Sequence, residues 1–242
     1  VNTDGGVNLQ FKLLSAIGII IIVSGHCYHG GMELAYNWFP PYSYNLALFV
    51  FISGYFYKTD YEENIGKYIW KRTKRLLIPA YLWNIFYGGM VAFLGLFGFT
   101  IGAKPDLYNL FVMPFVDGEA FQYNLGSWFV YPLFLVCIIN VLFRKFLKLI
   151  HLDNEFIVLI VYLAIGMIGI NTAIGNPTAI NGIVKLLVRT MFFLPCYEFG
   201  RFYKAVLEKK DTLNNVAYFA IIFAVQLILL TFCKDLEYTP SS

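Results

Sequence analysis

The sequence has 242 residues, of which 59% are apolar and only 14% are charged, with a mean hydropathy of +0.63. Soluble domains carry about a quarter charged residues, so an ordinary soluble domain is excluded. The charges cluster between long apolar blocks, which is typical of a polytopic membrane protein. We attribute the net charge of +3 to orientation in the membrane and expect no nucleic-acid partner.

Seven apolar segments are each close to the ~20 residues that a spanning helix needs. We expect helices over residues 9–28, 38–57, 76–100, 125–143, 156–172, 184–203 and 216–233, the second of them shortened by Pro40 and Pro41. The expected fold class is therefore all-α: a polytopic transmembrane helix bundle that forms a single domain over residues 1–242.

The distribution of basic residues predicts how these helices are oriented. With the N-terminus inside, all of the 18 Lys and Arg residues except Lys104, Lys185, Arg189 and Lys234 lie on the inner side. This asymmetry is what the positive-inside rule predicts. We therefore expect a multi-pass protein of the cell membrane, of the bacterial inner-membrane type, with a cytoplasmic N-terminus.

The first apolar segment ends in IIIIVSGHCYHGG, which places His26 in an expected helix. At about 100° per residue, Ser15, Gly18, Gly25 and His26 fall on one arc, whereas Ile20 points elsewhere. A neutral imidazole on such a small-residue face can accept a proton from a substrate hydroxyl near physiological pH. His26 is therefore a candidate general base, and the alternative is a core histidine with satisfied hydrogen bonds.

A basic segment, KYIWKRTKRLLIPAYLW, leads into the third apolar block and contains Arg72 and Arg75. Residues three apart share a face of a helix if the helix starts early, and two guanidinium groups there could grip phosphates bidentately. The alternative is an ordinary membrane anchor that contacts anionic lipid.

The later blocks carry a few charged and aromatic candidates. Glu198 and Arg201 are spaced to form a structural ion pair, and Arg189, near the other end of the same block, is a candidate substrate contact. Trp128 opens the fourth block, either as a membrane-interface residue or as a platform on which a sugar stacks. The four cysteines have no spacing typical of metal ligands or disulfides, so no metal is expected.

Five motifs follow one another along the chain: FKLLSAIGIIIIVSGH, ALFVFISGYFYK, IWKRTKRLLIPAYLW, SWFVYPLFLV and FFLPCYEFGRFYK. Their order and spacing resemble membrane-bound acyltransferase family 3, and look closest to its fucose 4-O-acetylase-like and surface-polysaccharide O-acyltransferase branch. The resemblance covers about residues 9 to 205. It implies O-acetylation or a related acyl transfer, from cytoplasmic acyl-CoA to a hydroxyl of a carbohydrate in the cell envelope. No bound cofactor is implied, because acyl-CoA, above all acetyl-CoA, is the donor substrate.

The resemblance also implies roles for individual residues. His26 matches the family's first-helix histidine and would act as general base or as carrier of the acyl group. Arg72 and Arg75 match its Arg-x-x-Arg pair. The family's arginine upstream of the histidine is Ser15 here, so this substrate-binding contact is missing or is taken over by Lys12. Family members have more helices, so either a C-terminal part is absent or the protein is a short variant.

Two other classes of function stay open on the residues alone. One is a non-catalytic transporter of a lipid-linked sugar or acyl intermediate, which would use the same interior without chemistry. The other is a seven-helix sensor, which only the number of helices supports.

Overall fold

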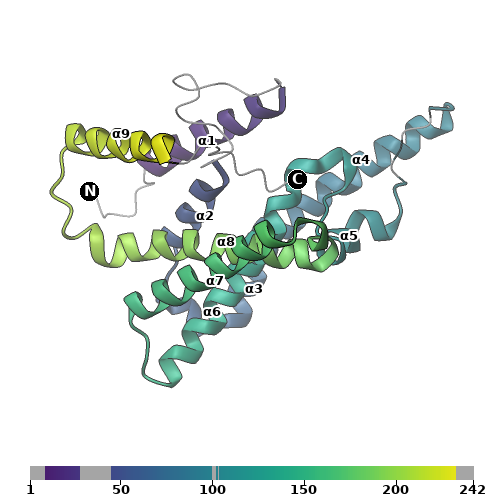
Figure 1. Ribbon diagram of the computed structural model, residues 1–242. Coiled ribbons are helices and arrows are strands. Elements are labelled where there is room, and N and C mark those ends of the chain that lie inside the picture. Colours follow the sequence, from purple (N-terminus) through teal and green to yellow (C-terminus); the bar gives the residue numbers. More distant parts are fainter. Residues whose placement is uncertain (1–8, 28–44, 100–101, 103, 233–242) are drawn as a thin grey trace. The chain divides into compact units, whose positions relative to one another are not determined.

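The computed structural model describes residues 9–27, 45–99, 102 and 104–232. All regular secondary structure in these ranges is helical, which confirms the all-α fold class (Figure 1). The chain divides into two compact units, one formed by Val1–Phe56 with Phe199–Ser242 and the other by Tyr57–Glu198.

The first unit contains the helices α1 (Leu9–Cys27), α2 (Asn45–Tyr55) and α9 (Asn215–Phe232), and the π-helical turn η7 (Tyr203–Leu207). Gly18 of α1 faces α2 so closely that a Cβ there would lie 3.0 Å from the ring of Phe49. Nearer the start of α1, the ring of Phe11 packs on the ring of Tyr55 at the end of α2, with centroids 4.3 Å apart. A small residue at the contact lets two helix backbones approach, as the small-residue face of the first segment predicted.

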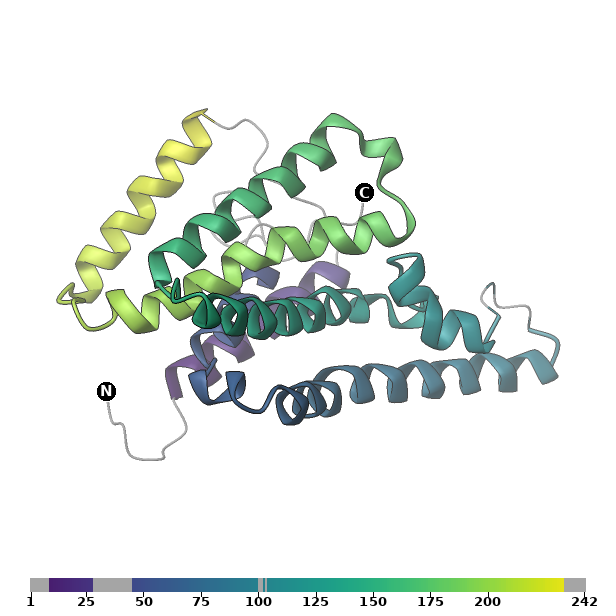
Figure 2. The same cartoon turned by 90° about the horizontal axis from the view of Figure 1, so that it is seen from below.

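The second unit contains most of the remaining elements. In chain order these are η2 (Thr59–Glu62), α3 (Ile65–Arg72), η3 (Thr73–Leu77), α4 (Ile78–Leu96), η4 (Tyr108–Val112), α5 (Met113–Val116), η5 (Gln122–Phe129), α6 (Val130–Leu149), α7 (Glu155–Gly175), η6 (Pro177–Ala179) and α8 (Gly182–Phe202), whose last turn belongs to the first unit. Helices α7 and α8 lie side by side (Figure 2), and glycines allow this, since a Cβ at Gly166 would come within 2.7 Å of Pro195 Cγ.

The boundaries of three expected spans differ from those in the structure. The third expected helix, 76–100, begins at Ile65 instead and continues through η3 into α4, because hydropathy marks where a helix enters lipid and not where it begins. The second, 38–57, is described only as α2 from Asn45, and residues 38–44, including both prolines, lie outside the described residues. The fourth expected helix, 125–143, corresponds to the end of the 3-10 segment η5 and to α6, which begins at Val130 and ends at Leu149.

Three helical segments of the described chain are long and apolar enough to cross a membrane: Ile65–Leu96, Gln122–Leu149 and Glu155–Gly175. Shorter apolar helices occur at Leu9–Val23, Leu46–Tyr55 and Asn215–Ile228. Their many exposed large apolar side chains are those that a bilayer would cover.

Candidate functional site

Arg72, one of the two predicted donor-binding arginines, is the last residue of α3 in the second unit. Its side chain is half-buried, and its guanidinium carbon lies 5.1 Å from the centre of the Tyr68 ring, one helical turn earlier. Tyr197 of α8 and Cys137 of α6 lie near the same guanidinium. The Tyr68 and Tyr197 hydroxyls share a hydrogen bond of 3.4 Å. Arg72 is thus a cation held among phenols and a thiol from three helices.

Arg75, the second predicted arginine, has a different environment. The helix does start early enough for Arg72 and Arg75 to lie in one continuous helix, but a π-helical turn begins directly after Arg72. The amide of Ile78 closes this turn on the carbonyl of Thr73, and Arg75 is exposed. Such π turns occur frequently at functional sites. The structure therefore provides one half-buried and one exposed guanidinium at the same end of a span.

Four tyrosines line the interior next to Arg72, and we call Tyr57, Tyr61, Tyr68 and Tyr197 the tyrosine cluster. Tyr61 stacks on Tyr68 with ring centroids 4.6 Å apart, and Tyr57 contacts Tyr68 and Tyr197 edge-on at 6.0 and 6.3 Å. Aromatic pairs in these geometries stabilise by about 0.5–1.5 kcal/mol beyond the burial of their area. Tyr68 and Tyr197 of this cluster thus surround Arg72 with packed aromatic rings.

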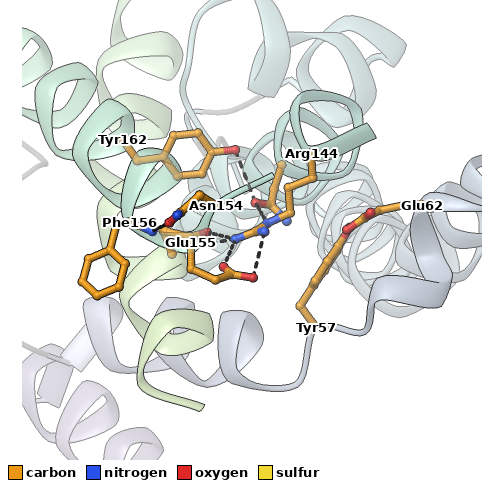
Figure 3. A network of polar contacts seen from close by, with 9 residues as sticks. Tyr57, Glu62, Arg144, Asn154, Glu155, Phe156 and Tyr162 are labelled. Atoms are coloured by element: carbon orange, nitrogen blue, oxygen red, sulfur yellow. Dashed lines mark hydrogen bonds and ion pairs between the residues drawn. The ribbon is translucent and has the colours of Figure 1, made fainter. Parts of the chain in front are cut away.

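A buried ion triad adjoins the tyrosine cluster (Figure 3). Arg144 Nη2 donates to both carboxylate oxygens of Glu198, at 2.6 and 2.7 Å, and to Glu155 Oε2 at 2.8 Å. The side chain of Arg144 is 4% exposed and that of Glu198 is 0% exposed. The Tyr57 ring lies 6.0 Å from the guanidinium carbon, so the triad and the tyrosine cluster are in contact.

Asn140 extends this triad along α6. Its side-chain oxygen accepts hydrogen bonds of 3.3 Å from Arg144 Nε, one turn later, and from the Tyr162 hydroxyl of α7. Its amide nitrogen is fully buried and has no hydrogen-bond partner among the described residues. Asn140, Arg144, Glu155, Tyr162 and Glu198 together form what we call the Arg144 network, which ties α6 to α7 and α8.

The sequence alone does not predict this network. It places Arg144 only among the basic residues of one membrane face, and it pairs Glu198 with Arg201. Arg201 lies half-buried near the end of α8, and its pairing with Glu198 stays a prediction. The spacing of Asn140 and Arg144, four apart in an apolar helix, is the one local sign that a polar stripe runs along α6.

Trp128 and Arg189, predicted separately as substrate contacts, come together. The Arg189 guanidinium lies 4.3 Å from the centre of the Trp128 ring, and its Nη1 donates to the Gly118 carbonyl at 2.6 Å. Arg189 is buried and Trp128 is half-buried. The cation–π contact therefore joins α8 to η5, with an energy of about 0.5–2 kcal/mol at such sites.

The two candidate residues of the first helix, Ser15 and His26, belong to the first unit. Ser15 is half-buried in α1, and His26 lies in the last turn of the same helix, while the His26 side chain is outside the described residues. The catalytic role of His26 therefore stays a prediction. Among the described residues no cluster of three or more His, Cys, Asp or Glu could hold a metal ion.

Comparison with known proteins identifies the family. No curated protein and no solved structure matches the chain. Residues 8–238, by contrast, match the family model described as an acyltransferase domain, that of acyltransferase family 3. This match spans nearly the whole sequence and agrees with the apolar helices described above. The chain belongs to acyltransferase family 3, and it is a membrane acyltransferase.

Proposed function

We propose that this membrane acyltransferase is an O-acyltransferase that uses cytoplasmic acyl-CoA, with acetyl-CoA the first donor to test, and acylates a hydroxyl of a cell-envelope carbohydrate. The observation that carries the donor side of the proposal is the placement of Arg72 at the basic end of the segment Ile65–Leu96. Arg72 and Arg75 are the cations that would meet the phosphates of the donor there.

The two arginines would have different parts in donor binding. Arg75 is exposed, so it would meet a phosphate group from solvent and contribute mainly through charge. Arg72 is half-buried and fixed on Tyr68, so it would form stronger hydrogen bonds with less loss of side-chain entropy. Hydrogen bonds to charged groups contribute about 1.5–3 kcal/mol each, which corresponds to about 10- to 100-fold in affinity.

This difference leads to a test. Arg72→Gln should raise the KM for acyl-CoA by about 10- to 100-fold, and Arg75→Gln should raise it less and only at low salt. Lys148→Gln, which removes an exposed cation from α6, is the matched control and should leave the KM unchanged. A KM for acyl-CoA that is unaffected in Arg72→Gln would exclude Arg72 from donor binding.

His26 would carry the chemical step by one of two routes. As general base, it accepts the proton of the acceptor hydroxyl while the oxygen attacks the thioester carbonyl, and the departing CoA thiolate then takes up this proton. As acyl carrier, its imidazole nitrogen attacks the thioester first, CoA leaves as the thiol, and the acceptor hydroxyl takes the acyl group in a second step. Incubation with labelled acyl-CoA and no acceptor separates the routes, because only the second leaves label on the protein.

The acceptor end of the proposal involves Trp128 and Arg189. Apolar faces of sugars pack on indole rings, and here one face of the Trp128 ring lies against Arg189. If the pair binds the carbohydrate, Trp128→Phe should largely retain acceptor KM and Trp128→Leu should raise it severalfold at equal protein stability. If both variants leave the KM for the acceptor unchanged, the contact between Trp128 and Arg189 serves packing and not acceptor binding.

The reaction class itself is tested in cells. Mass spectrometry of surface polysaccharide from strains with and without the gene should differ by one acyl group per modified repeat. His26→Ala at equal membrane abundance should abolish this difference, and undiminished transfer would remove His26 from the mechanism. Loss of the polysaccharide itself in the knockout would instead indicate transport of a lipid-linked intermediate.

A further inference from the structure

One face of α3 and of the turn that follows it presents three lysines around a tryptophan. Lys67, Trp70, Lys71 and Lys74 have the i, i+3, i+4, i+7 spacing of a single helix face, and all four side chains are exposed. The Lys74 ammonium lies 5.0 Å from the centre of the Trp70 ring, so the face continues into η3. We call these four residues the lysine face.

The lysine face is not the buried side of α3 and η3. Buried side chains of the same segment, among them Tyr68 and Leu77, pack it into the protein. None of the three lysines forms an ion pair with a described residue, and Lys71 donates one hydrogen bond of 3.2 Å to the Tyr61 hydroxyl. Three exposed cations without anionic partners among the described residues call for a partner of negative charge.

The position of the lysine face along the chain specifies this partner. α3 continues through η3 into α4, within a segment long and apolar enough to cross a membrane. The charged start of such a segment lies at the level of lipid headgroups, where lysines attract anionic lipid and an indole ring is favoured. Trp70 is 55% exposed, as expected of a ring that packs against lipid and not against protein.

We propose that the lysine face is a binding site for the headgroups of anionic phospholipids, with Trp70 inserted between them. Within the basic segment, Lys67 and Lys74 would then face the bilayer surface, Lys71 would do so from its contact with Tyr61, and Arg72 lies against Tyr68. This assignment requires only that the chain spans a membrane, and it does not depend on the donor, the acceptor or His26.

Contact quenching of Trp70 by brominated lipid tests the proposal. The full chain is placed in nanodiscs of phosphatidylcholine and phosphatidylglycerol, with bromine on the acyl chains of one lipid or the other. The Trp70 signal is the difference between the unmodified protein and Trp70→Phe. We expect brominated phosphatidylglycerol to quench Trp70 several-fold more than brominated phosphatidylcholine, and the triple variant K67Q/K71Q/K74Q to lose this preference.

Two controls keep the test specific. Trp83, an exposed ring within α4, should be quenched equally by both lipids, and the variant K145Q/K148Q, which removes two exposed cations from α6, should retain the preference at Trp70. Should the triple variant not fold, high salt applied to the unmodified protein replaces it, since screening should abolish the preference.

Three results would overturn the proposal. One is equal quenching of Trp70 by the two lipids, and another is a preference that survives both the triple variant and high salt. The third is loss of the preference on addition of CoA, which would assign the lysine face to the nucleotide. Acyltransferase activity is not read in any of these measurements, so the proposal fails or holds separately from the proposed function.

Discussion

Replacement of Arg144 by methionine should strongly destabilise the protein. The change removes the cation that satisfies the carboxylate of Glu198, which is 0% exposed and accepts from Arg144 at 2.6 and 2.7 Å. Breaking a buried ion pair by deleting one partner costs about 3–5 kcal/mol, since the remaining charge stays buried and uncompensated. Asn140 and Glu155 also lose contacts, so we expect the upper half of this range.

A second substitution, at Glu198, should restore much of the stability that Arg144→Met loses. In Arg144→Met with Glu198→Met, no charge of this pair is left fully buried, and replacement of a buried ion pair by apolar side chains is often neutral. Glu155 keeps its charge, but its side chain is 22% exposed and can be hydrated. The double variant should therefore recover at least about 2 kcal/mol relative to Arg144→Met.

An exposed ion pair of equal length provides the control. Lys185 Nζ lies 2.7 Å from Glu119 Oε1, whose side chain is 49% exposed. Exposed pairs contribute about 0–1 kcal/mol, so Lys185→Met should cost no more than this. Burial, and not the distance between the charged atoms, accounts for the difference between the two replacements.

The measurement is the free energy of unfolding of the purified variants in mixed micelles, followed by intrinsic fluorescence as the fraction of denaturing detergent rises. The reasoning is refuted if Arg144→Met lies within about 1 kcal/mol of the unmodified protein, or if the double variant is no more stable than the single one. Tyr197 precedes Glu198, so the single variant should also disturb the Tyr197–Tyr68 hydrogen bond beside Arg72 and raise the KM for acyl-CoA.

Two further predictions concern the end of α8 and the loop after it. Gly200→Ala should lower the free energy of unfolding by about 1–3 kcal/mol, because its Cβ would collide with the Phe51 carbonyl of α2. Gly89→Ala has nothing within 4 Å of the new Cβ and should be neutral or slightly stabilising, so equal thermal midpoints for the two variants would contradict the packing. A hydrogen bond from Tyr218 holds the pKa of Asp211 below its ordinary range. This contact therefore stabilises the folded protein fully at pH values above the ordinary pKa of an aspartate, and the stabilisation is lost as the pH falls through the lower pKa that Asp211 has in the folded protein. NMR titration should give a depressed pKa for Asp211 that rises in Tyr218→Phe, and an unchanged pKa in that variant would speak against the contact.

The helical segments could be located from the sequence because a single, local property fixes them. Each apolar run has its own cost of transfer into lipid, whatever its neighbours are, and a single segment in lipid satisfies its backbone hydrogen bonds by itself only as a helix. The boundaries were less predictable. α3 is helical from Ile65 although it is charged, because its Tyr68 side packs into the protein while its lysines remain outside.

The family was likewise readable from short motifs, since each motif is contiguous in the chain. The residues that surround Arg72 could not be identified from the sequence. Tyr68 is its neighbour along the helix, but Cys137 and Tyr197 come from α6 and α8, far away in the sequence. Spacing within one helix can place Arg72 on a face, and it contains no information about which side chains of other helices meet that face.

The sequence by itself determined that this is an all-α membrane protein, which segments are apolar enough to enter lipid, and to which acyltransferase family it belongs. Only the tertiary structure decided that Glu198 pairs with Arg144, that Arg189 packs on Trp128, and that Arg72 packs on Tyr68 while Lys74 lies over Trp70. The physical reason is that hydropathy adds up along one segment, whereas the partner of a buried charge depends on which faces of separate helices come into contact.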